Sequence, residues 1–182
     1  MIKCIAIVGN DDPFGDLLAD KFQREGWTVF RFGTGADPVD AVASVSSKAG
    51  QIDILVLNTR PKIEYTIVPG TVDMGKLLNA FEQGAHSITR YVDAFLPIIG
   101  GLKRIVIICL SRDKDTEDRA AAMSQPALHQ AESMLGATLR PQGYDIALFS
   151  SDETADKAFE ELTGGTSFEE LTWQNVPPEL RP

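Results

Sequence analysis

The sequence contains little of what metal sites and disulfide frameworks require. Its 182 residues include two cysteines and two histidines, too few for the spaced ligand sets that hold zinc, so no metal site is predicted. Cys4 and Cys109 lie in predicted buried strands, where we expect free thiols in a reducing compartment.

Long apolar runs and excess positive charge are also lacking. No stretch reaches the roughly 18 apolar residues that cross a bilayer, and the start MIKCIAIVG lacks the pattern of a secretory leader, which favours a cytoplasmic protein. The net charge of −9 argues against nucleic acid or an anionic membrane as a partner. Residues 152–182 contribute −6 of this charge, which is typical of a solvated acidic tail.

A regular alternation of apolar strands and amphipathic helices runs through the chain. The expected strands cover residues 2–8, 27–32, 52–58, 104–110 and 144–150, and the expected helices cover 16–25, 37–50, 73–99, 124–140 and 153–163. Strands that are apolar throughout and alternate with helices predict an α/β fold. We expect a three-layer, doubly wound parallel sheet, Rossmann-like, with about five to six strands and helices on both faces.

The same pattern predicts how the chain is divided. Residues 1–152 would form a Rossmann-like domain. Residues 153–182 would form an acidic C-terminal helix and tail that belong to the same domain.

Five segments follow one another in a familiar order. IAIVGNDDPFGDLLADKFQREGWTV places a glycine turn between a strand and a helix, and DILVLNTR ends the third strand. AFLPII, RIVIICL and ALHQAESMLGATLRPQGYDI come next. In this order the segments, which span roughly residues 3–152, resemble the short-chain dehydrogenase/reductase family. The resemblance implies a Rossmann fold that binds NAD or NADP.

The cofactor-binding positions that the resemblance implies are only partly matched. The matching residues are Gly9, Asn10, Gly15 and Asn58. Gly9 and Gly15 correspond to the first and third glycines of the family's turn, whereas Pro13 stands at the middle glycine, which lets the backbone approach the pyrophosphate.

Other charged residues near this turn have two interpretations each. Asp11 and Asp12 could face a phosphate, but a role as caps of the following helix, with Pro13 in its first turn, is the preferred interpretation. Arg31, in the second strand, either indicates a 2′-phosphate and hence NADP, or pairs with an acidic side chain.

The positions that the resemblance assigns to catalysis hold other residues. The tyrosine and lysine positions hold Ala121 and Gln125, and the helix asparagine position holds Gly84. Leu110 stands at the serine position, with Ser111 next to it as a weak candidate for a displaced group. A methyl group cannot exchange a proton with a substrate, and a neutral amide cannot lower the pKa of a tyrosine.

The end of the chain also departs from the family. Family members continue well past the fifth strand, with segments that form the substrate pocket, whereas Ser150 and Ser151 lead here into an acidic tail. The resemblance therefore implies a divergent, C-terminally truncated member in which the lid over the substrate is missing.

Two long helices of the resembled family pair across a two-fold axis. Here they correspond to residues 73–99 and 124–140. The later helix carries a stripe of small and apolar residues: Met123, Ala127, Ala131, Met134, Leu135 and Thr138. Small residues permit close approach of helices, so a homodimer through these two helices is predicted.

The function expected from the sequence is a non-catalytic binding or assembly module that has lost the dehydrogenase active site. The alternative is an NAD(P)-dependent oxidoreductase that acts on a carbonyl/alcohol pair with displaced catalytic groups. A sensor for a smaller nucleotide or metabolite is a third possibility.

Overall fold

A computed structural model describes residues 3–9, 13–58, 87–109, 119–150 and 155–164. Of residues 109, 119–126 and 150 it describes the backbone alone. In chain order the strands are β1 (Cys4–Val8), β2 (Thr28–Phe32), β3 (Ile52–Asn58), β4 (Ile99–Cys109) and β5 (Asp145–Ser150). The α-helices are α1 (Pro13–Arg24), α2 (Pro38–Lys48), α4 (Ser87–Phe95), α5 (Arg119–Leu139) and α6 (Ala155–Thr163).

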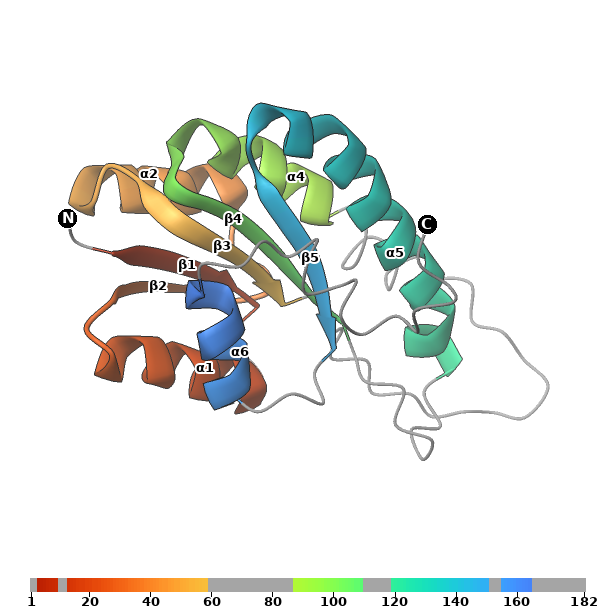
Figure 1. Ribbon diagram of the computed structural model, residues 1–182, viewed down its shortest axis with the longest axis horizontal. Helices are drawn as coiled ribbons and strands as arrows, with labels where there is room; N and C mark the ends of the chain where they lie inside the picture. Colours follow the sequence, from red (N-terminus) through yellow and green to blue (C-terminus); the bar gives the residue numbers. More distant parts are fainter. Residues whose placement is uncertain (1–2, 10–12, 59–86, 110–118, 151–154, 165–182) are drawn as a thin grey trace.

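The five strands form one parallel sheet in the order β2-β1-β3-β4-β5. Helices α1 and α6 cover one face, and α2, α4 and α5 cover the other (Figure 1). The predicted three-layer, doubly wound α/β fold is therefore confirmed, with five strands among the described residues.

Alternation along each strand builds two cores because successive side chains point to opposite faces of the sheet. Ile5 and Ile7 of β1 pack with Phe22 of α1 on one face. Ala6 and Val8 pack on the other face, where Phe95 of α4 is fully buried. Burying a phenylalanine side chain contributes about 1.5–3 kcal/mol.

Local signals set most of the element ends. Asp37 caps α2 by accepting a hydrogen bond from the backbone N–H of Val39 at 2.8 Å, and Pro38 is the first helical residue, as predicted. Pro13 likewise opens α1. Gly26, Gly50 and Gly143 have positive φ angles just past helical segments, as expected for residues that end helices.

Three predicted boundaries were wrong. Helix α5 begins at Arg119, not near residue 124, because the alanine-rich segment before Pro126 is itself a strong helix former. Strand β4 begins at Ile99, not at Arg104, since a shift in its register with β3 lets Ile99 pair with Ile52. The helix predicted to reach residue 99 ends at Phe95, and a 3-10 turn from Leu96 to Ile98 follows it.

Two expectations fall on residues outside the described ranges. They are the first part of the helix predicted over 73–99, residues 73–86, and the capping role of Asp11 and Asp12. Among the described helices, none is both long enough and apolar enough to cross a membrane.

Candidate functional site

The order of the strands reverses between β1 and β3. From β1 the chain moves outward to β2 and then returns to the other side of β1 to form β3. Open α/β sheets bind ligands in the crevice beyond the carboxyl ends of the strands at such a point. Gly9 directly follows β1 and Asn58 is the last residue of β3, and both residues line this crevice.

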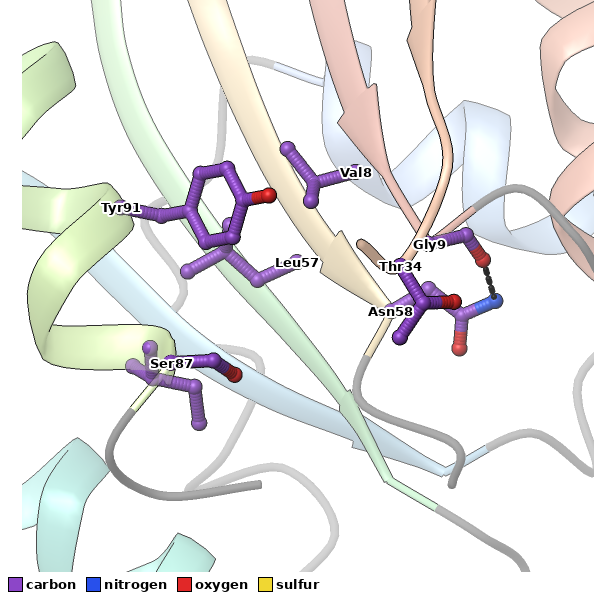
Figure 2. A pocket seen from close by; sticks show the side chains of 8 residues that line it. Val8, Gly9, Thr34, Leu57, Asn58, Ser87 and Tyr91 are labelled. Atoms are coloured by element: carbon purple, nitrogen blue, oxygen red, sulfur yellow. Dashed lines mark hydrogen bonds between the residues drawn. The ribbon is translucent and has the colours of Figure 1, made fainter. Parts of the chain in front are cut away.

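Gly9 and Asn58 join the ends of three strands. The N–H of Gly9 donates to the carbonyl oxygen of Phe32 at 2.8 Å, and the side-chain Nδ2 of Asn58 donates to the carbonyl oxygen of Gly9 at 2.9 Å (Figure 2). Gly9 has a φ of +79°, and a Cβ there would lie closer than 3.0 Å to the backbone of Asn58. Both the backbone conformation and the close approach therefore require glycine.

The other end of the Asn58 amide is unsatisfied. The residue is 4% exposed, and its Oδ1 accepts no hydrogen bond from any residue that the structure describes. A buried acceptor without a donor costs about 1–3 kcal/mol, so such an atom points to an ordered water or to a ligand that carries a donor. Among the described residues it is a buried side-chain acceptor without a donor, and its residue lines the crevice.

Helix α4 and the connection between β2 and α2 form the remaining walls. Tyr91 and Ser87 come from α4, and Thr34 comes from the connection. Figure 2 shows the ring of Tyr91 above Leu57, on the same side of the sheet as Val8. The crevice therefore opens on the face covered by α2 and α4.

Tyr91 closes this space. The residue is 5% exposed, and its hydroxyl donates to the carbonyl oxygen of Ala36. Burial, together with the negative charge of Asp37, raises the pKa of the phenol, and Arg90 opposes that rise. The phenol is thus a neutral hydrogen-bond donor at physiological pH.

The cavity that these described residues enclose is small. The cavity between the described residues has a volume of about 10 Å³, which is about what one water molecule needs. The crevice has the position of a nucleotide site, and this cavity by itself holds no more than about one water molecule.

The structure brings together two of the four predicted cofactor residues, Gly9 and Asn58. Gly15 is buried in the first turn of α1, which covers the opposite face of the sheet, and Asn10 lies outside the described residues. Arg31 pairs with Asp20 of α1 at 2.6 Å and with Asp16 at 3.7 Å, in agreement with the alternative that it pairs with acidic side chains.

The positions predicted for catalysis are described only in part. Ala121 and Gln125 lie in the first two turns of α5, and the structure describes their backbone alone. Gly84, Leu110 and Ser111 lie outside the described residues.

Sequence reasoning missed Tyr91, Thr34 and Ser87. Tyr91 repeats at helical spacing with the buried residues Ile88 and Phe95, so its side chain is indistinguishable from a core residue in the sequence. Its role depends on Ala36, which is 55 positions away along the chain.

A second surface feature lies between α4 and α5. It is an open groove of about 500 Å³, lined by Thr89, Ala127, Gln130, Ala131, Met134, Leu135 and Thr138. Met134 is 63% exposed, although it is a large apolar side chain. Five of the six residues of the predicted stripe line this groove. The sixth is Met123, of which the structure describes the backbone alone.

Fold and crevice together define a Rossmann-like α/β protein with a switch-point site. No protein-family model matches the sequence, and no curated protein matches it. The structure is similar to a crystal structure of a small-chain dehydrogenase, with a TM-score of 0.72 and 15% sequence identity over 90% of this chain and 91% of that chain.

Two further solved structures have the same fold. One is a putative short-chain alcohol dehydrogenase from Burkholderia multivorans, with a TM-score of 0.69 and 17% identity over 89% of this chain and 90% of that chain. The other is an enoyl-[acyl-carrier-protein] reductase (NADH) from Aquifex aeolicus VF5, with a TM-score of 0.65 and 18% identity over 81% and 72%. This chain therefore has the Rossmann fold of short-chain dehydrogenases and reductases.

Proposed function

We propose that this protein is a short-chain-dehydrogenase-like Rossmann protein without dehydrogenase activity, which acts as a binding or assembly module. The observation that carries the proposal is the residue at the position of the proton donor. Ala121 on α5 stands where the resemblance places the catalytic tyrosine, and Gln125 stands one turn later at the lysine position.

The chemistry of these two residues supports the proposal. Reduction of a carbonyl needs a group that donates a proton to the substrate oxygen. Alanine has no such proton, and glutamine carries no charge that could lower the pKa of a neighbouring donor.

The assembly that we propose is a homodimer through α4 and α5, the helices that correspond to the predicted helices 73–99 and 124–140. A groove lined by small residues such as Ala127 and Ala131 allows the backbones of two copies to approach closely. Met134 would be buried in such a contact, and a methionine adapts to the surface that it meets. A two-fold axis would place the same patch on both subunits.

We also propose that residues 1–152 and 153–182 belong to one domain in a cytoplasmic protein. Helix α6 supports the first part, because Ala158 and Leu162 are buried in the same core as Phe22 of α1.

The test combines binding and turnover. Purified protein is titrated with NAD, NADP and their reduced forms while its melting temperature is measured. A ligand present at about 100 times its Kd would stabilise the fold by about 2.7 kcal/mol, so the absence of a shift at millimolar cofactor supports the proposal. Cofactor-dependent conversion of a carbonyl/alcohol pair would contradict it.

A second candidate is an NAD(P)-dependent oxidoreductase with displaced catalytic groups. Its cofactor would be lined by Gly9, Asn10, Gly15 and Asn58. It is favoured by Asn58, which lines the crevice and whose buried Oδ1 has no donor among the described residues. A melting temperature that rises with cofactor concentration, with turnover that is lost in Ser111→Ala, would establish this candidate instead.

A further inference from the structure

Strand β5 forms one edge of the sheet. It is the last strand in the order, and no strand among the described residues pairs with its outer side (Figure 1). An edge of this kind presents backbone N–H and C=O groups to which another chain can add a strand. The central residues of β5, Ile146 to Phe149, are all apolar, so they carry no charge that would oppose such pairing. Protection of this edge therefore depends on a neighbouring element.

The 3-10 turn that precedes β5, Arg140–Gln142, supplies a contact with this edge. Nη2 of Arg140 donates to the carbonyl oxygen of Ile146 at 3.0 Å. The arginine side chain is 39% exposed, so it reaches this carbonyl from the outer side of β5, because β4 occupies the inner side. The guanidinium thus occupies a backbone acceptor that an added strand would need.

Helix α5 holds the guanidinium in this position. Oε1 of Glu132 pairs with the same Nη2 at 2.5 Å. Gly136, one turn further along the helix, is buried, and a Cβ there would lie closer than 3.0 Å to Nη1 and to the central carbon of the Arg140 guanidinium. Residues 132, 136 and 140 are four positions apart, so they share one side of the helix. A carboxylate and a glycine therefore position this arginine against the edge.

The next outward-facing position of β5 is Leu148. In a strand the N–H and C=O groups of residues two positions apart point to the same side, so those of Leu148 point outward together with the Ile146 carbonyl. The side chains of both residues belong to the core that α5 covers. The backbone amide of Leu148 therefore reports whether another strand is paired with this edge.

We propose that Arg140 protects the outer edge of β5 from pairing with the β5 of a second copy of this chain. Two copies present the same apolar edge, and a two-fold axis relates two identical strands that pair antiparallel, so the edge is complementary to itself. With the guanidinium on the Ile146 carbonyl, a partner strand cannot use that acceptor. The contact goes beyond the proposed homodimer, because neither Gly136 nor Arg140 lines the groove between α4 and α5.

The test compares three substitutions, each made in the wild-type chain and in Met134→Glu, so that association at β5 is measured separately from the proposed homodimer. Arg140→Ala removes the guanidinium. Gly136→Ala keeps the charge but displaces the guanidinium, and alanine is the better helix former. Arg24→Ala is the matched control, since Arg24 is an exposed arginine of α1 whose Nε donates to the carbonyl oxygen of Asp20 in the same helix at 3.4 Å.

Sedimentation velocity at increasing protein concentration measures the association. In both backgrounds Arg140→Ala and Gly136→Ala should form larger species as the concentration rises, whereas Arg24→Ala should sediment like its background. Hydrogen exchange identifies the surface that is used. The Leu148 amide should exchange at least about tenfold more slowly in the associated variants than in their backgrounds.

The inference is overturned if Arg140→Ala and Gly136→Ala sediment like Arg24→Ala. Association without protection of the Leu148 amide also overturns it, because another surface would then be used. A Leu148 amide that is already protected in the dilute wild type overturns it as well, because the edge would then be covered without a second β5. If circular dichroism shows that Arg140→Ala is unfolded, Gly136→Ala decides. Met134→Glu alone tests the proposed homodimer separately, since Arg140 is intact in it.

Discussion

Among single residues, Gly9 is the one whose replacement the structure tolerates least at the site. Its φ of +79° matches the φ of +81° at Gly26, so the two glycines have the same backbone requirement. They differ in their surroundings, because a Cβ at Gly9 would collide with the backbone of Asn58, whereas a Cβ at Gly26 would meet nothing within 4 Å.

Gly9→Ala is therefore expected to cost more than Gly26→Ala. The left-handed backbone alone costs about 1–2 kcal/mol in either variant, and the collision in Gly9→Ala adds about 1–3 kcal/mol. Urea denaturation of both variants measures the difference. Equal losses of stability would contradict the close approach of β1 and β3.

The raised pKa of Tyr91 predicts a dependence of stability on pH in the alkaline range. The folded pKa lies above the unfolded value of about 10. The unfolded chain then loses the proton first, so stability is fully present below about pH 10 and falls as pH rises toward the folded pKa. Unfolding curves between about pH 8 and 11 should show a shallower decline in Tyr91→Phe than in the wild type.

The comparison for that experiment is Tyr144→Phe, which also removes a phenol hydroxyl that donates to a backbone carbonyl. A decline that both substitutions reduce equally would refute the assignment to Tyr91.

Among the elements, α6 is attached to the sheet through a buried arginine. Arg104 of β4 is 5% exposed, donates to the carbonyl oxygen of Leu162 at 2.7 Å and pairs with Asp145 of β5 at 3.4 Å. Desolvation lowers the pKa of this guanidinium and Asp145 opposes the shift. A buried side chain thus binds the last turn of α6, where helix carbonyls lack partners within the helix.

Arg104→Met should destabilise the protein by about 3 kcal/mol, because it removes the buried ion pair with Asp145 and the hydrogen bonds to the carbonyl oxygens of Glu161 and Leu162. Hydrogen exchange in Ala155–Thr163 should accelerate more than exchange in α2. Arg31→Met is the control, since Arg31 pairs with exposed carboxylates and its loss should cost less than about 1 kcal/mol. Similar losses in both variants would show that the Arg104 contacts contribute little.

At the scale of the whole molecule, the α4/α5 groove is the apolar surface that the proposed dimer would cover. Met134→Glu places a charge in this groove and should convert the homodimer to a monomer, measured by sedimentation velocity. Leu17→Glu is the matched control, because Leu17 is 58% exposed on α1, which covers the opposite face of the sheet. A monomeric wild type, or a dimer that survives Met134→Glu, would refute the interface.

The architecture was predictable because it depends on patterns that are local in the sequence. Apolar strands such as IAIV and IDILVLN, separated by amphipathic helices, permit few arrangements other than a covered parallel sheet. The site was predictable only in part. Gly9 and Asn58 are adjacent to strand ends, which topology brings to one edge, so a sequence pattern suffices to place them.

The sequence by itself determined the alternation of elements, the ends of helices at Asp37–Pro38 and at Gly26, and the residues that stand at the catalytic positions. Only the tertiary structure decided how much space the crevice has. The cavity there is lined by Tyr91, whose hydroxyl meets the Ala36 carbonyl across 55 positions of chain, and by Asn58, whose amide bonds to Gly9 across 49 positions. Contacts of this kind arise from packing between distant elements, which no local pattern encodes.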